Sequence, residues 1–543
     1  MLTGHIHADD LTGTWHSDTQ GWHSERSSIK PYIHSALETF CVAAGHQKAF
    51  VVREKVRGAG SNTPLDIHIH ADDMKEKVAE LLQWPLDYVV LLVSDIPGEP
   101  VIMRYGGCSA AAIFLVPDGK FLRFHWDAAC LYPFLKQSVD FSRAAYVLRF
   151  MGTPISRKTL FPDMKQLTER ACARWDTLSG KLDIEYPSAK PHSLARKLSP
   201  NADVLGHFDE VLRATIGRWY ANEPIACELS GGLDSGSVAV AAAKLNERPI
   251  HTYGLIVPDT LGDEQALRRT DVILQCGATD TPVSALAFAP FCDGGRAPGD
   301  AAVPWSEYYH EAFTALLSRA KADGHEAILR GIGGDEIAQA QDGEDDEALY
   351  APEDEDEVRR EVPSFITADA LEASRSIRGK LDPAPSGIAD RTTYEAAVAC
   401  STVYLRSGVW PYYPFACADL VEFCRRLPAE WRLGRVLQRR YLETHKLPRR
   451  VSYPENPESF LPVMHHALKQ QSQAFVESLF AESRLADLGL VSQDTLIASF
   501  RRYCTAGYNG EAEYLFEAAS LELTLRGIEE ARCLDHAQIA RIV

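Results

Sequence analysis

The sequence predicts an α/β protein in which a domain built on an antiparallel sheet precedes a domain built on a parallel sheet. Three observations lead to this fold class. Short β-rich runs separated by turn residues fill roughly the first 150 residues, strands and helices alternate from about residue 200, and the chain beyond about residue 395 is mostly helical. Alternating strands and helices are typical of a parallel sheet covered on both faces. We place the two domains at residues 1–188 and 189–543.

The first domain contains three clear β-rich runs, at Tyr88–Ser94, Val101–Tyr105 and Ala110–Val116. Turn residues, Pro97-Gly98 and Pro117–Lys120, separate and follow them. We therefore expect the whole stretch 87–124 to belong to one antiparallel sheet.

The hexapeptide HIHADD occurs twice in this domain, at 5–10 and 68–73. Histidines two residues apart lie on one face of a strand and could bind a metal. A coincidental repeat in half-exposed strands is the simpler interpretation.

The second domain shows the alternation of a parallel sheet. Strands are expected at 224–229, 249–257 and 327–330, and helices at 237–246, 263–276 and 305–322. Gly277 is placed to end the second of these helices. The acidic stretch 342–357 reads as a solvated loop, or as a lid or docking segment for a basic partner.

Composition excludes several classes of protein. The net charge of −19 disfavours nucleic-acid binding, which needs a basic face. No apolar run is long enough for a transmembrane helix, and the first residues do not resemble a signal peptide. The 12 cysteines form no CxxC pair, which argues against a zinc site or a disulfide framework. We expect a cytoplasmic protein that is not embedded in a membrane.

The stretch ELSGGLDSGSVAV, residues 228–240, joins an expected strand to an expected helix. Parallel sheets bind ligands at this end of their strands. Gly231 and Gly232 allow the backbone to approach an anion closely, and Ser230 and Ser235 can donate to phosphate oxygens. Asp234 would repel a phosphate but suits a Mg²⁺ ion that bridges phosphates. Because the lysine of a Walker loop is missing, another type of nucleotide site is indicated.

Residues 230–235 resemble the SGGxDS signature of the PP-loop ATP pyrophosphatases. A second motif, Gly331-Ile332-Gly333-Gly334-Asp335-Glu336, resembles the GxGxDE motif of asparagine-synthetase-like enzymes. Weaker likenesses are Tyr253-Gly254-Leu255, where the family's main chain reads adenine, Tyr413-Pro414-Phe415, and Lys158–Phe161. The resemblance implies ATP and Mg²⁺ as cofactors, with Asp234 and Asp335 as metal ligands. It implies ATP binding by Leu229, Ser230, Gly231, Gly232, Leu233, Asp234, Ser235, Gly254, Leu255 and Gly333.

The chain departs from this family at three positions, and no catalytic residue can be assigned. Glutamine-hydrolysing members have a nucleophilic cysteine after the first methionine, whereas Leu2 stands here. The first domain therefore resembles a degenerate Ntn-hydrolase (glutaminase-like) domain that supplies no ammonia. Ile332 replaces a glutamate or tyrosine that helps the attacking amine. Asn456 stands roughly where the family has a pyrophosphate-binding lysine, for which Arg449 or Arg450 is a possible substitute.

These features together resemble the lasso peptide cyclases. In that family ATP adenylates a side-chain carboxylate of a precursor peptide, and the peptide's own amine closes a macrolactam ring. An intramolecular amine depends less on a strong general base, which suits Ile332. The implied partners are a precursor peptide and a leader-peptidase protein. The alternatives are β-lactam-synthetase-like closure of a small amino acid, asparagine-type amidation, or a weakened homologue that serves as a scaffold.

Overall fold

The computed structural model describes residues 1–57, 59–108, 110–188, 195–220, 224–245, 248–257, 259–292, 302–339, 362–385, 387–456, 459–506 and 510–534. The acidic stretch 342–357 lies outside these residues. Within them, no helix is long and apolar enough to cross a membrane.

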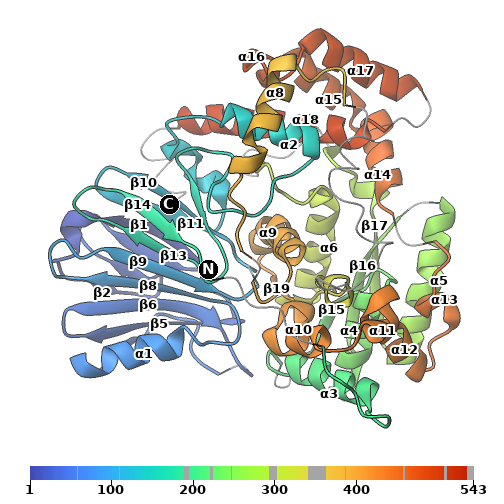
Figure 1. Cartoon of the computed structure of the whole chain (residues 1–543), viewed down its shortest axis with the longest axis horizontal. Helices are drawn as coiled ribbons and strands as arrows, with labels where there is room; N and C mark the ends of the chain where they lie inside the picture. The colour runs from blue at the N-terminus through green and yellow to red at the C-terminus, as the bar shows by residue number, and fades with distance from the viewer. Residues whose placement is uncertain are drawn as a thin grey trace.

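The part of the chain up to residue 188, which we call the first half, forms two seven-stranded sheets (Figure 1). The first has the order β12-β10-β11-β1-β4-β3-β2. Its strands are Lys165–Leu167, Ile113–Asp118, Phe121–His125, Leu2–His7, Ser28–Pro31, Trp22–His23 and His16–Ser17. The second has the order β14-β13-β9-β8-β6-β5-β7. Its strands are Leu182–Glu185, Cys172–Trp175, Val101–Gly106, Tyr88–Ser94, Gln47–Glu54, Leu37–Ala44 and Asp66–His68.

The core of this half lies between the two sheets. Trp22 on β3 and Phe50 on β6 bring their ring centroids to 5.0 Å across the layers. Leu2 is fully buried on β1 in the same core. Helix α1 (Met74–Leu81) packs its buried Met74 and Leu81 against β5, β6 and β8 to form a separate small core.

The expectation of a single sheet over 87–124 is wrong. The hairpin of β8 and β9 belongs to the second sheet, while the hairpin of β10 and β11 belongs to the first. Strand β10 begins at Ile113 rather than Ala110 and runs through Pro117 to Asp118. In each hairpin a largely buried strand, β8 or β10, pairs with a strand of more mixed burial, β9 or β11. The pattern therefore predicts the strands but not the layer that each one joins.

The two HIHADD copies fold alike. Each ends in one turn of 3₁₀ helix, at Ala8–Asp10 and Ala71–Asp73. The histidines before these turns lie in or next to β1 and β7. Among the described residues there is no group of three or more His, Cys, Asp or Glu side chains that could hold a metal ion, so the metal interpretation gains no support.

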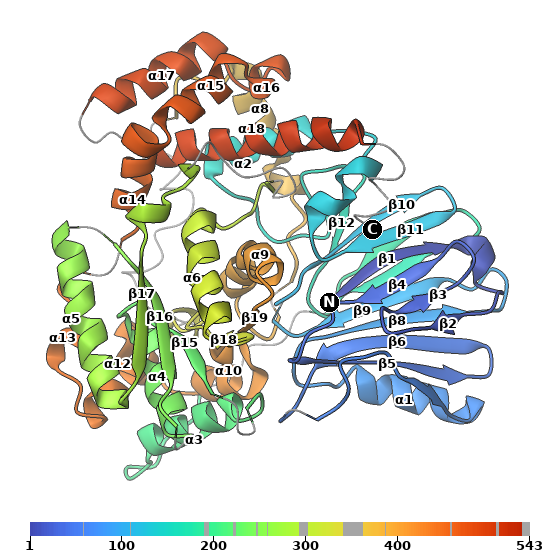
Figure 2. The same ribbon diagram turned by 180° about the vertical axis from the view of Figure 1, so that it is seen from behind.

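The rest of the chain, which we call the second half, contains a five-stranded parallel sheet of order β17-β16-β15-β18-β19. Its strands are Thr279–Ser284, His251–Ile256, Ala226–Glu228, Ala327–Leu329 and Trp410–Tyr412. Helices α4 (Leu233–Ala243) and α5 (Asp259–Cys276) pack together, while α6 (His310–Ala322) contacts β16 and β17. Figure 2 shows strands β16 and β17 between α5 and α6, so helices cover both faces as the alternation predicted.

Three expected helix starts differ from the structure, and helix α5 begins at Asp259 rather than at residue 263. Helix α4 begins at Leu233 rather than residue 237, which places Asp234 in its first turn. Helix α6 begins at His310 rather than Trp305. The Trp305 ring instead stacks on Phe114 of the first sheet, with centroids 5.2 Å apart. Gly277 follows α5 with a φ of 60°, which fits its expected role at the helix end.

The remaining helices form two groups. Helices α3, α9, α10, α11, α12 and α13 lie near the parallel sheet, at Val204–Ile216, Arg391–Arg406, Ala418–Arg425, Ala429–Arg432, Val436–Thr444 and Arg449–Ser452. A second apolar core joins α2, α8 and α14 to α18, at Phe141–Phe150, Ala368–Ile377, Leu461–His466, Gln473–Ala481, Arg484–Asp487, Gln493–Thr505 and Ala512–Arg532. Helix α2, from the first half, therefore packs among helices of the second (Figure 1).

A buried carboxyl group links the two halves. Glu54, at the end of β6, accepts hydrogen bonds from the indole N–H groups of Trp219 at 3.1 Å and Trp410 at 2.6 Å. Burial, reinforced by the neighbouring Asp87 carboxyl group, raises the pKa of Glu54 to about 8. A second buried contact joins Arg406 of α9 to Asp127 at 2.7 Å.

Candidate functional site

The loop between β15 and α4 is held in shape by its own serines. The Ser235 hydroxyl accepts the Ser230 backbone N–H at 3.1 Å, and the two hydroxyl groups lie 3.1 Å apart. Gly231 has a φ of 94°, a conformation that favours glycine. Gly232 caps α4 without a side-chain hydrogen bond, so the first amides of that helix are available to an anion.

Gln265 of α5 ties this loop to the end of β16. Its amide nitrogen donates to the carbonyl oxygens of Ser230 and Leu255, both at 2.9 Å. The carbonyl of Leu255, expected to read adenine, therefore already accepts a hydrogen bond from a side chain of the protein. A Cβ atom on Gly254 would lie 1.8 Å from an Arg269 nitrogen and 2.2 Å from the Leu229 carbonyl oxygen. Only glycine fits there.

The second motif packs directly against the first. A Cβ atom on Gly331 would lie 2.7 Å from the backbone nitrogen of Ser235, and one on Gly334 would lie 2.2 Å from the Asp234 side chain. Gly333 has a φ of 97° and sits against Phe415. The glycines of the second motif thus allow two loops to touch that are far apart in the sequence.

Asp234 and Asp335 meet at one cation, the guanidinium group of Arg435. The Arg435 Nη2 nitrogen lies 2.6 Å from Asp335 Oδ1 and also forms an ion pair with Asp234 Oδ2. Burial raises the pKa of Asp234 to about 7, although Arg435 acts against that shift. Asp335 is the more open of the two, with a side chain that is 66% exposed.

The arrangement fits a metal-bound nucleotide. Asp234 Oδ1 is buried and has no hydrogen-bond partner among the described residues, so it could ligate a cation. The second carboxylate converges on the same point and already shares a positive charge with the first. Oxygen ligands from one or two carboxylates, completed by phosphate oxygens, are what Mg²⁺ prefers in such sites.

Asn456, expected roughly where the family has a lysine, brings no charge to this site, whereas Arg268 does. The Asn456 side chain donates to Glu264 at 2.9 Å. The buried Arg268 guanidinium group donates to the carbonyl oxygens of Gly231 at 3.2 Å and Asn456 at 3.1 Å. A buried cation therefore lies next to the position at which the sequence led us to expect a lysine.

The two arginines considered as substitutes have other contacts. Arg450 pairs with Asp271 through two hydrogen bonds, of 2.6 and 2.7 Å. The Arg449 guanidinium group lies 4.5 Å from the ring centroid of Tyr453.

Arg435, Arg268 and Gln265 were not found from the sequence. Arg435 follows Gly434, and both residues have left-handed backbone angles just before α12. A Gly-Arg pair ahead of a helix was the only available signal, and it is a weak one.

Near Ile332, the second motif offers an acid of its own. Glu336 accepts a hydrogen bond from the Thr392 hydroxyl group at 2.8 Å, which links the motif to the first turn of α9. Burial raises the pKa of Glu336. Ile332 packs against the main core and offers no polar atom.

Comparison with known families agrees with this geometry. The asparagine synthase family profile matches residues 207–271 and 308–526, which cover both motifs, Arg268 and Arg435. A search of curated proteins found no match. Because the matched residues make up more than half of the chain, it belongs to the asparagine synthase family and is, at the level of that family, an ATP-dependent C–N ligase.

Proposed function

We propose that this chain joins a carboxylate and an amine of one peptide, using ATP and releasing AMP and pyrophosphate. The observation that carries the proposal is the convergence of Asp234 and Asp335 on a single cation beside the glycine-rich loop. Asp234 and Asp335 would hold Mg²⁺, which stabilises negative charge on phosphate oxygens when it is bound. Ser230, Ser235 and the first amides of α4 would hold the phosphates.

The reaction has two steps that balance. A substrate carboxylate oxygen attacks the α-phosphorus of ATP, the bond to the β-phosphate breaks, and pyrophosphate leaves. The amine nitrogen then attacks the acyl carbon of the mixed anhydride, the amide bond forms, AMP leaves and the amine loses a proton. Arg268 and Arg435 supply positive charge next to the loop where the leaving pyrophosphate would lie.

An internal amine suits this chain better than ammonia. Leu2 has no thiol, so the first half has no cysteine at that position to release ammonia from glutamine. Ile332 cannot take a proton, and an amine tethered to the acyl group needs less help from a base. Macrolactam closure of a lasso-type precursor peptide is therefore our specific proposal. A separate leader-peptidase protein would be its partner.

Closure of a small amino acid, as in β-lactam synthetases, is the second candidate, because it also uses an internal amine. Asparagine-type amidation and a scaffold role are the remaining alternatives.

ATP–pyrophosphate exchange tests these readings. The probes are a panel of peptides with a free N-terminal glycine and one Asp or Glu at varied positions, and N-carboxyalkyl amino acids as small substrates. Exchange that requires a peptide, with loss of one water from that peptide by mass spectrometry, is the expected result. Exchange with the small substrates alone would favour the second candidate. Complete absence of exchange, with ATP hydrolysis also absent, would favour the scaffold.

A further inference from the structure

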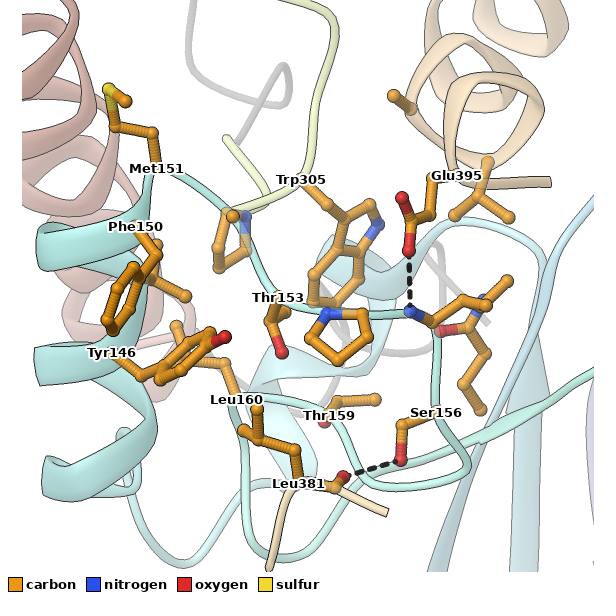
Figure 3. Close-up of a pocket in the computed structure, with 18 of the residues that line it drawn as sticks. Tyr146, Phe150, Met151, Thr153, Ser156, Thr159, Leu160, Trp305, Leu381 and Glu395 are labelled. Carbon is orange, nitrogen blue, oxygen red and sulfur yellow. Dashed lines mark hydrogen bonds between the residues drawn. The ribbon is translucent and has the colours of Figure 1, made fainter. Parts of the chain in front are cut away.

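A cavity of about 730 Å³ lies at the junction of the two halves and is separate from the loops described above. Its walls come from α2, the segment 151–160, the segment 304–308, the residues before α9, α9 itself and α18. Figure 3 shows Tyr146 and Phe150 of α2 on one side, with Trp305 and Glu395 facing them across the space. The volume falls in the range of about 300–1,000 Å³ that is typical of sites for drug-sized ligands.

Helix α9 connects this cavity to the nucleotide site. Thr392, in its first turn, is hydrogen-bonded to Glu336 of the second motif. Its neighbour Arg391 lines the cavity, as do Glu395, Ala396, Val398 and Ala399 further along the helix. Glu395 is one helical turn from Thr392 and accepts the backbone N–H of Ile155 at 3.1 Å. The cavity and the second motif are therefore attached to the same rigid element.

The lining of the cavity is mostly apolar, with an acid in its wall. Tyr146, Phe150, Trp305 and Tyr308 supply aromatic surface. Glu517 of α18 is only 1% exposed, and its Oε2 atom accepts a hydrogen bond from the Tyr308 hydroxyl group at 3.1 Å. Its other oxygen, Oε1, is buried and has no hydrogen-bond partner among the residues that the structure describes. A buried polar atom without a partner is costly, and a ligand that bonds to it removes that cost.

We propose that this cavity binds a segment of the peptide substrate, with a large apolar side chain against the aromatic wall and a peptide group hydrogen-bonded to Glu517. The inference rests on the proposed function and names the part of the substrate that this chain selects. A site of this size has room for more than a small amino acid, so the cavity favours the peptide reading over the small substrate. It also gives the first half of the chain a role, because α2 and residues 151–160 form one wall.

Binding of a short peptide to the full chain, without ATP, tests the cavity directly. The probes are N-acetyl-Gly-Phe-Gly-amide, N-acetyl-triglycine-amide and phenylalanine amide, each titrated by ligand-observed NMR. We expect saturable binding of the phenylalanine tripeptide and at least tenfold weaker binding of the other two. Equal binding of all three probes would overturn the inference.

Variants that fill the cavity locate the binding. Ala396→Trp and Thr153→Trp add bulk from two different walls, and Ala474→Trp on the exposed surface of α15 is the matched control. Each filling variant should weaken tripeptide binding at least tenfold, whereas the control should bind like the wild type. Two filling positions are used so that a folded variant, verified by its thermal melt, is available. Unchanged binding in a folded filling variant would contradict the proposal.

The polar contact has its own test. Glu517→Leu keeps an apolar wall but cannot form a hydrogen bond, and Glu513→Leu, one turn away and exposed, is its control. We expect Glu517→Leu to weaken tripeptide binding about fivefold or more and Glu513→Leu to leave it unchanged. Equal binding by both variants would exclude Glu517 as a ligand contact.

The inference and the proposed function can fail separately. Tripeptide binding that is blocked by Ala396→Trp, in a chain that shows no ATP–pyrophosphate exchange with any peptide, would support the cavity and reject the ligase. Peptide-dependent exchange that persists at full rate in Ala396→Trp would support the ligase and reject the cavity.

Discussion

Asp234, in the first turn of the helix after β15, and Asp335, in the loop after the neighbouring strand β18, share one nitrogen of Arg435. The guanidinium group occupies the place where two acids would otherwise repel each other, and it is the place proposed for a metal. Arg435 and a bound metal ion would therefore compete for the same two carboxylates, and each side of this competition can be tested.

Removal of either carboxylate should abolish most of the activity. We expect Asp234→Asn and Asp335→Asn each to lower the rate of ATP–pyrophosphate exchange about 100-fold or more, because each would remove a metal ligand. Asp369→Asn, an exposed position in α8, is the matched control and should exchange at the wild-type rate. Wild-type exchange in both site variants would show that the metal lies elsewhere.

Removal of the internal cation should favour the external one. We expect Arg435→Ala to bind Mn²⁺, as a probe for Mg²⁺, about tenfold more tightly than the wild type in the absence of nucleotide, because two acids lose their competing partner. Electron paramagnetic resonance of free Mn²⁺ at pH 8.5 measures this. Arg440→Ala, whose guanidinium group lies over the Trp431 ring, is the control. An unchanged affinity would mean that Arg435 does not compete with the metal.

The close contact between the two motifs should tolerate no side chain. In Gly334→Ala, the added Cβ atom would lie 2.2 Å from the Asp234 carboxyl carbon, so a loop must move. We expect a loss of stability of about 1–3 kcal/mol and a fall in exchange of at least tenfold. Gly510→Ala has open space around its Cβ position and should change neither the melting temperature nor the exchange rate. A fully active Gly334→Ala variant would show that the loops can separate without loss.

The stability of the chain should fall as the pH rises, in part because of Glu517. Burial raises the pKa of this carboxyl group to about 8 in the folded chain, well above the ordinary value near 4.3 that it regains on unfolding. Between those values the folded state holds a proton that the unfolded state has lost, so the free energy of unfolding decreases as the pH rises from about 5 to 8. Glu517→Gln cannot ionise and should flatten that part of the profile.

Thermal melts at several pH values between 5.5 and 8.5 measure the effect. From pH 5.5 to pH 8.5, the melting temperature of Glu517→Gln should fall less than that of the wild type. The difference should be on the order of a few degrees. Glu513→Gln, which changes an exposed carboxyl group on the same helix, should keep the wild-type slope. A wild-type slope in Glu517→Gln would mean that this group titrates normally.

Local sequence predicted much of the ligase half. The glycine-rich loop lies between a strand and a helix as expected, and Asp335 reaches it from the neighbouring strand. These features are encoded locally, because glycines, hydroxyl groups and an acid at fixed spacing can be recognised in the sequence without knowledge of the rest of the fold. Strand β19 was not predicted because Pro411 lies in its middle. Proline argues against a strand unless that strand is at the edge of a sheet, and β19 is at the edge.

The parts that could not be predicted depend on long-range contacts. Arg435 lies far along the chain from both acids, and a left-handed pair of residues directs it to them. The assignment of two similar hairpins to different sheets depends on long-range packing between strands, and the residue pattern of a single strand does not encode that packing. Glu517 becomes unusual only through burial beside Tyr308, and its sequence neighbours give no sign of that.

The hydrogen bonds that Glu54 accepts from Trp219 and Trp410 determine how this chain can be divided into stable fragments. A fragment that lacks the two antiparallel sheets would lose the acceptor of both indole N–H groups and expose the surface that the sheets cover. We expect such a fragment to aggregate. The two antiparallel sheets therefore contribute buried polar contacts to the fold of the rest of the chain, whatever chemistry they do or do not perform themselves.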